Sequence, residues 1–133
     1  MTDYDLTMSS LFFIQIFILL LIFLPLILGL IFMGTQKKIV LKHKDSGINK
    51  NGFVGYCWTY FFFGFFVPIF RGEIMIGIFH LIFSLVTFGI FQLVMPFLYN
   101  KQYSTRLLTT GWELNDSEEK NMLARLKIGI AKP

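Results

Sequence analysis

The chain has 133 residues, a formal net charge of +4 and a mean hydropathy of +0.65. Only 15% of its residues are charged, whereas 55% are apolar and 18% are aromatic. Because soluble domains carry about 25% charged residues, this composition excludes an ordinary water-soluble fold. The length excludes a multi-domain enzyme, and the single cysteine, Cys57, excludes an intrachain disulfide and a cysteine-rich metal site.

The first apolar segment covers residues 11–33, which contain no charged side chain. At a rise of about 1.5 Å per residue a helix of this length exceeds the roughly 30 Å of a hydrocarbon core. Residues 1–10 carry Asp3 and Asp5 but no Lys or Arg, and no Ala-x-Ala cleavage pattern follows the apolar run. The segment is therefore predicted to be a retained transmembrane helix that follows an extracytoplasmic N-terminus.

A basic segment, residues 34–52, comes next. Its five lysines outnumber its single acid, Asp45. These lysines, which we expect to set the topology and to meet anionic lipid headgroups, are Lys37, Lys38, Lys42, Lys44 and Lys50. A short apolar run at 39–41 and turn residues at 44–47 predict a cytoplasmic β-hairpin-like segment.

Two further apolar segments follow. Residues 53–70 are short, aromatic and broken by two glycines and a proline, so they could span the bilayer or form a re-entrant segment. Residues 71–73 are predicted to form a tight turn, and residues 74–99 are long enough to span easily.

The distribution of Lys and Arg favours a model with three transmembrane helices. With the N-terminus outside and the tail, residues 100–133, in the cytoplasm, 11 of the 12 basic residues lie inside. A re-entrant second segment would instead send the third segment outward with the basic tail. The predicted fold is thus an all-α integral membrane protein, with a short amphipathic helix at about residues 116–127 of the tail.

Several short motifs lie between residues 38 and 112. They are Gly55-x-Cys57-Trp58-Thr59-x-Phe61-Phe62-Phe63-Gly64, Phe70-Arg71-Gly72-Glu73, Tyr99-Asn100-Lys101-x-Tyr103 and Leu107-Leu108-x-x-Gly111-Trp112. Together they resemble the HrgC-like family of small bacterial inner-membrane proteins, in which Ser often replaces Cys57 and the N-terminal span is not part of the pattern. The resemblance implies a multi-pass protein of the bacterial inner (plasma) membrane, and it assigns no activity, cofactor or site residue.

The third apolar segment carries a polar stripe. At 100° per residue its members fall within about 80° of one another on one helix face. They are Glu73, Gly77, His80, Ser84 and Thr87. The stripe could line a pore or form a proton-sensitive contact, or its small and hydroxyl residues could serve helix packing. The lack of a deep charge in this segment argues against an ion-coupled transporter.

Three hypotheses for function remain. The first is a non-enzymatic subunit or scaffold that acts through protein partners, and the second is a homo-oligomeric pore or membrane-perturbing effector lined by the third helix. The third, a lipid-modifying enzyme, would depend on Glu73, His80 and Cys57, which form no recognised constellation. We expect no enzyme activity, no cofactor, no metal and no nucleic-acid partner. The expected partners are membrane lipids and either further copies of the chain or another membrane protein.

Overall fold

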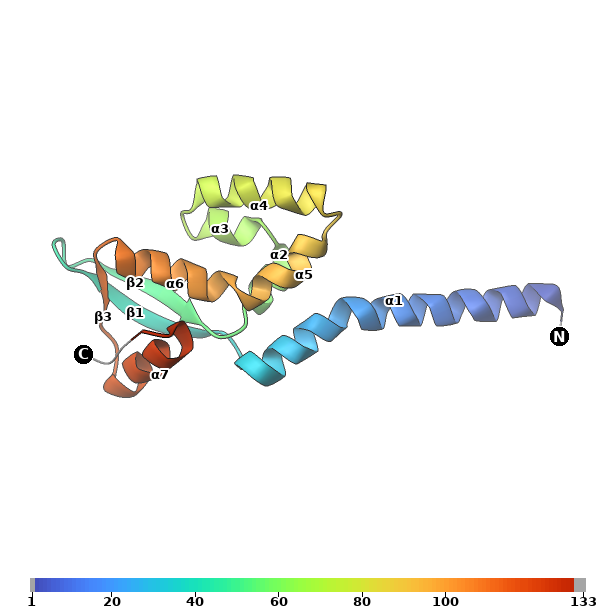
Figure 1. Cartoon of the computed structure of the whole chain (residues 1–133), viewed down its shortest axis with the longest axis horizontal. Helices are drawn as coiled ribbons and strands as arrows, with labels where there is room; N and C mark the ends of the chain where they lie inside the picture. The colour runs from blue at the N-terminus through green and yellow to red at the C-terminus, as the bar shows by residue number, and fades with distance from the viewer. Residues whose placement is uncertain (1, 131–133) are drawn as a thin grey trace.

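The computed structural model of the chain describes residues 2–130, so residue 1 and the last three residues of the predicted tail, including Lys132, lie outside the described range. One end of the molecule is a small sheet with two helices, and the other end is built from helices alone (Figure 1). A single long helix, α1 (Asp3–Met33), extends away from both.

Helix α1 is long, apolar and almost entirely exposed. Its 31 residues span about 46 Å, and only 6% of its most apolar 18-residue window is buried. Thr2 and Asp5 form a capping box at its start, and the ammonium group of Lys127 lies 2.5 Å from the Met33 carbonyl at its end. Within residues 2–130, α1 is the one unbroken helix with the length and apolar composition to cross a membrane.

The basic segment folds into a β-hairpin that becomes part of a sheet. Strand β1 (Lys37–His43) pairs antiparallel with β2 (Asn49–Val54) on one side and with β3 (Trp112–Leu114) on the other. The prediction of an all-α fold is therefore wrong. The short strand β3 begins 58 residues after the end of the hairpin, so no local turn signal predicted it.

Helix α6 (Tyr99–Thr109) covers the open edge of β2. The hydroxyl of Ser104 donates to the Phe53 carbonyl at 2.6 Å and accepts from the Phe53 amide at 3.0 Å. The absence of a side chain at Gly52 allows this approach, since a Cβ there would lie 2.8 Å from Leu41 and 3.3 Å from the Ser104 hydroxyl. The edge strand is thus closed by a side chain instead of by another strand.

Helix α7 (Glu118–Ile128) packs against the buried face of the same sheet. Its Ala124 and Ile128 form a small apolar cluster with Ile39 of β1 and Val54 of β2. The amphipathic helix predicted in the tail is therefore a packed element of the fold.

Residues 58–97 form two helical excursions from the sheet end. They contain α2 (Trp58–Phe63), α3 (Phe66–Phe70), α4 (Ile74–Val86), α5 (Ile90–Val94) and the 3₁₀ helix η1 (Met95–Phe97). The first excursion turns at Gly64, where φ is +57°, and returns to Arg71. The second turns at Phe88 and Gly89 and returns to α6, because α4 and the helix after it are bent by 119°.

The three-span prediction is contradicted by this geometry. Residues 53–70 comprise the end of β2 and two short helices, and residues 74–99 comprise a 13-residue helix, a sharp bend and a short return. Counting apolar residues measures hydrophobic length but does not detect a reversal of direction. The reversals occur where the backbone adopts positive φ at Gly64, Phe88 and Gly89.

The position of the turn at 71–73 also differs from the prediction. It was expected on the opposite side of the membrane from the basic segment, but Arg71 contacts Gln36 and Asn100, which border the sheet. The charge argument for three spans assumed that residues 74–99 run straight. Because both excursions return, the basic segments come together at one end without a third span.

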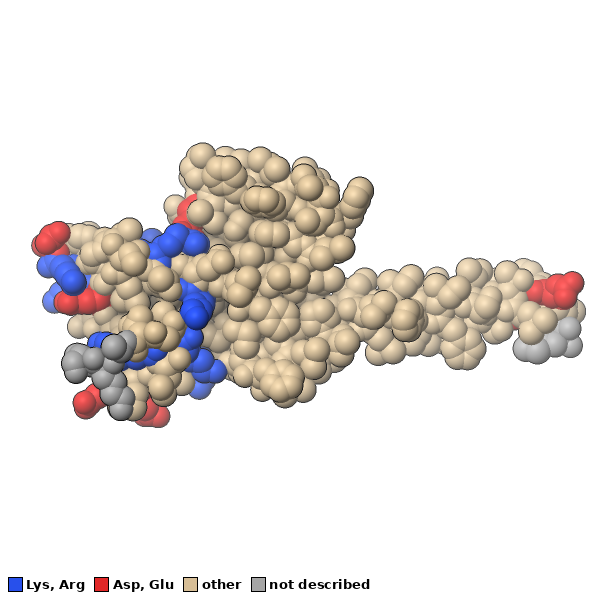
Figure 2. Space-filling view, in the orientation of Figure 1, with Lys and Arg blue, Asp and Glu red and all other residues tan. Residues whose placement is uncertain are grey.

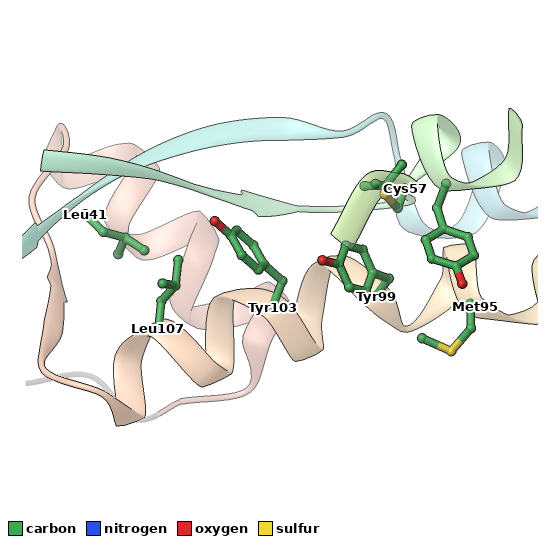
Figure 3. Close-up of a cluster of buried hydrophobic side chains, with 8 residues drawn as sticks. Leu41, Cys57, Met95, Tyr99, Tyr103 and Leu107 are labelled. Atoms are coloured by element: carbon green, nitrogen blue, oxygen red, sulfur yellow. The ribbon is translucent and has the colours of Figure 1, made fainter. Parts of the chain in front are cut away.

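One buried cluster joins the sheet to the helical excursions. Figure 3 shows its labelled side chains in a row, from Leu41 and Leu107 beside the strands, past Tyr103 and Tyr99, to Cys57 and Met95. Tyr99, Tyr103 and Leu107 are spaced by four residues and lie on one face of α6. Helix α6 therefore contributes to this cluster from the sheet to the helical excursions.

Replacement of Ser104 by Ala should lower the free energy of unfolding by about 1–3 kcal/mol, because it leaves both polar groups of Phe53 without their partner. Equilibrium unfolding of the detergent-solubilised protein by dodecyl sulfate would measure the change. Thr105→Ala, an exposed position on the same helix, is the matched control and should change stability by less than about 0.5 kcal/mol. Equal effects of the two substitutions would contradict the edge-closing role of Ser104.

Candidate functional site

Arg71 occupies the junction between α3 and α4 and connects three parts of the chain. Its Nη1 donates to Asn100 Oδ1 of α6 at 2.9 Å, and its Nη2 donates to Gln36 Oε1 just before β1 at 3.1 Å. Nη2 also lies 3.7 Å from the Cys57 sulfur. Asn100 in turn donates to Gln36 Oε1 and to the Gly55 carbonyl, so both amide side chains are fixed in place.

Three aromatic rings surround the same guanidinium group. Its Cζ lies 3.9 Å from the ring centroid of Phe53, 5.0 Å from that of Tyr103 and 5.1 Å from that of Tyr99. Each distance lies within the roughly 6 Å at which a cation is attracted to an aromatic ring. Among residues 2–130 no carboxylate oxygen comes within 4.0 Å of Arg71. Its direct contacts are therefore amides, a thiol and rings, and the charge of Glu73 acts on it only from beyond ion-pair distance.

A second charged group lies beside the Arg71 cluster, where Glu73 accepts from Arg106 at 2.6 and 2.8 Å and from the Tyr99 hydroxyl at 2.8 Å. Burial by itself would raise the pKa of the Glu73 carboxyl. The hydrogen bonds from Arg106 and Tyr99 and the charges of Arg106 and Arg71 outweigh burial and hold that pKa below its usual value. This bidentate pair fixes the start of α4 to α6.

A pocket of about 460 Å³ adjoins Arg71. Its lining combines two basic and two neutral polar residues with a larger apolar part, and no acidic residue lines it. The lining residues are Gln36, Lys38, Phe53, Trp58, Thr59, Phe63, Val67, Phe70 and Arg71. Chemically, such a pocket can hold an anion that carries an apolar tail.

The polar stripe of the third segment faces the interior of the monomer. His80 Nδ1 lies 2.9 Å from the Tyr60 hydroxyl, and a Cβ at Gly77 would lie 2.5 Å from Ile69 of α3. The buried Ser84 hydroxyl has no hydrogen-bond partner among the described residues, and the Thr87 hydroxyl accepts from the Phe91 amide in α5. With Glu73 paired to Arg106, four of the five members of the stripe contact other helices of the same chain.

The five lysines of the basic segment are spread over the hairpin. Lys37, Lys38 and Lys42 lie exposed on β1, and Lys44 is exposed in the turn after it. Lys50 is half-buried, with its ammonium group 6.0 Å from the Tyr103 ring and 5.9 Å from the Trp112 ring. Of the five, Lys38 alone lines the pocket beside Arg71.

Sequence reasoning assigned Arg71 a turn role and gave no role to its partners. Gln36, Asn100 and the rings of Phe53 and Tyr103 became visible as one site only after folding. The available signal was a lone arginine between two long apolar segments, because such a charge needs nearby polar partners. The spacing of Tyr99 and Tyr103 by four residues also indicated a common helix face.

Within residues 2–130 no group of three or more His, Cys, Asp or Glu side chains is placed to hold a metal ion. Comparisons of the chain with models of protein families, with curated proteins and with solved structures find no match. The resemblance to the HrgC-like family therefore stays a prediction from sequence motifs.

The pairing of Glu73 predicts an acid-dependent loss of stability. A carboxylate with a lowered pKa in the folded state contributes stability above its unfolded pKa of about 4.3, and this contribution disappears as the pH falls through the folded value. Thermal unfolding of the detergent-solubilised protein between pH 7 and pH 3 would show a falling midpoint in the wild type. Glu73→Gln should be destabilised at pH 7 and should lose part of the acid dependence.

Glu119→Gln is the control for that measurement, since Glu119 is an exposed acid in the first turn of α7. It should keep the wild-type pH profile. An unchanged profile in Glu73→Gln as well would show that another group controls the acid response.

Proposed function

We propose that the protein is a small, non-enzymatic membrane protein that holds a folded unit at the inner face of the plasma membrane and acts there through a protein partner. The sheet unit consists of β1, β2, β3, α6 and α7. The observation that carries the proposal is the separation of charged and apolar surface along the molecule. On the face shown in Figure 2 the Lys and Arg side chains gather at the sheet unit and where the excursions join it, and the rest of the excursions and α1 show no charge up to the acids at the N-terminal end. The charged residues of the excursions, Arg71 and Glu73, both lie in the short link between α3 and α4.

The exposed apolar side chains support this placement. Most large apolar residues of α1 are between 39% and 80% exposed, and α4 presents side chains such as Leu85 and Val86, each 69% exposed. Continuous apolar surface of this extent is unstable in water but suits a hydrocarbon environment. Every Lys and Arg follows residue 34, whereas the first ten residues carry only acids, so the positive-inside rule places the sheet unit in the cytoplasm.

The two excursions would enter the bilayer from its inner face without crossing it. Helix α4, the longest of their helices, has 13 residues and spans about 20 Å, less than the roughly 30 Å of the hydrocarbon core. At its far end Phe88 is 96% exposed and adopts a positive φ of 54°, a conformation that is strained for a residue with a side chain. An exposed aromatic turn of this kind suits insertion into lipid.

The outer face of α7 offers a surface to a cytoplasmic partner. Met122 and Leu126 are 46% and 72% exposed there. They line a groove of about 610 Å³ together with Lys37, Glu119 and Lys120, so its lining contains both apolar and charged groups. A surface of mixed character is typical of interfaces between proteins that also exist apart.

A membrane-perturbing role is the second candidate, and the one-sided insertion of the excursions favours it. Helices that enter from one face add more area to the leaflet on that side and would favour curvature. A pore lined by the polar stripe is less well supported, because His80, Gly77 and Glu73 would have to exchange their contacts within the chain for water. Tubulation of vesicles at high protein density, without ion leakage, would support the second candidate.

Cysteine labelling tests the topology. In a Cys57→Ser background, single cysteines at Ser46, Gly72 and Ser117 should react with an impermeant reagent from the cytoplasmic side, and one at Ser9 from the opposite side. At Gly72 nothing lies within 4 Å of an added Cβ, but its φ of +85° makes a cysteine there strained, so the folding of this variant is checked by its thermal unfolding midpoint. Labelling of position 72 from the same side as position 9 would contradict the re-entrant arrangement.

Extraction from native membranes tests the partner. With a mild detergent, the wild-type protein should co-purify with a companion at a fixed ratio, and Leu126→Asp should lose it because a charge enters the apolar part of the groove. Lys44→Asp, on the exposed turn of the hairpin, is the control and should retain the companion. A complex that survives Leu126→Asp would exclude α7 as the contact.

A further inference from the structure

We propose that the pocket beside Arg71 binds a single anionic phospholipid, with its phosphate at Arg71 and Lys38 and one acyl chain along Trp58, Phe63 and Phe70. The inference rests on the proposed membrane placement and adds a defined ligand to it. A pocket of about 460 Å³ falls within the range of small-molecule sites, roughly 300–1,000 Å³.

The charged lining of the pocket suits an anion. Arg71 and Lys38 are both lining residues and carry positive charge, and no acidic residue is among the lining residues. Within the described residues Arg71 has no carboxylate partner, and its three contacts leave two of the five guanidinium N–H groups for a ligand. Because Gln36, Asn100 and three rings hold it, the guanidinium is already ordered before a ligand arrives.

The rest of the pocket is built for a hydrocarbon chain. Trp58, Phe63 and Phe70 belong to the first excursion and are 41%, 58% and 83% exposed. In the proposed placement they face the inner leaflet, directly below the level at which Arg71 and the sheet unit meet the headgroups. A free phosphate would meet the charged lining and leave this apolar wall uncovered, so charge and shape together favour a lipid.

Trp58 provides a direct probe of the occupant. In a Trp112→Phe background it is the only tryptophan of the chain, because the sequence contains two. The full-length protein would be reconstituted into zwitterionic phosphatidylcholine bilayers that contain a small fraction of brominated lipid, either phosphatidylglycerol or phosphatidylcholine. Bromine quenches tryptophan fluorescence only at short range, so selective quenching by the anionic lipid reports its enrichment at the pocket.

The wild-type protein should be quenched at a several-fold lower fraction of brominated phosphatidylglycerol than of brominated phosphatidylcholine. Lys38→Gln should reduce this preference about five-fold, the effect of one basic residue near a membrane surface. Lys42→Gln is the matched control: it removes the same charge from the same strand, but Lys42 does not line the pocket. Lys38→Gln is chosen over an Arg71 variant because Lys38 is exposed and Arg71 also holds the fold together.

Equal quenching by the two brominated lipids, or equal losses in Lys38→Gln and Lys42→Gln, would overturn the inference while leaving the membrane placement intact. Loss of the preference on addition of millimolar inorganic phosphate would also overturn it, since the site would then take free phosphate. Absence of quenching by either lipid would place Trp58 outside the bilayer and would contradict the proposed function itself.

Discussion

The packing of Arg71 is the constraint on which the other parts of the structure depend. A guanidinium group at the junction of two apolar helices needs polar or aromatic partners. This one donates hydrogen bonds to the amide oxygens of Gln36 and Asn100 and lies beside three aromatic rings. These contacts hold the end of the first excursion against the sheet unit. The second excursion must then begin at the same end of the molecule, where Glu73 pairs with Arg106.

This arrangement explains how a short chain fixes helices that are too short to cross a bilayer. Each excursion starts and ends at polar anchors: the first runs from the backbone of β2 to Arg71, and the second runs from Glu73 to α6. Between the anchors, Tyr60 and His80 form a hydrogen bond between the two excursions. Helix α6 contributes to both ends, since Ser104 closes the sheet edge and Tyr99 reaches Glu73. The proposed scaffold and the proposed lipid pocket both depend on these contacts between α6, the sheet and the two excursions.

Much of the local structure was predictable from the sequence. The exposed apolar helix, the basic hairpin and the amphipathic helix of the tail each follow from a continuous pattern of residues that lie close together in the chain. The excursions were not predictable in the same way. The same run of apolar residues is compatible with a straight transmembrane helix and with a pair of short helices that reverses direction. Gly64 was visible as a break in the second apolar segment, but the turn at Phe88 and Gly89 was not. The candidate site was the least predictable part, since Gln36, Phe53, Arg71 and Asn100 come from four separate segments.

The sequence by itself therefore determined that the chain carries one long apolar helix and that its basic residues all follow that helix. The composition of a segment and the positions of its charged residues along the chain are known before the chain folds. Only the tertiary structure decided that the later apolar segments reverse direction and that Arg71 faces the same end as the lysines. The physical reason is that a hydropathy pattern records the solvent that each segment prefers. The direction of a helix after a break depends on which distant polar groups form hydrogen bonds with the residues at its ends.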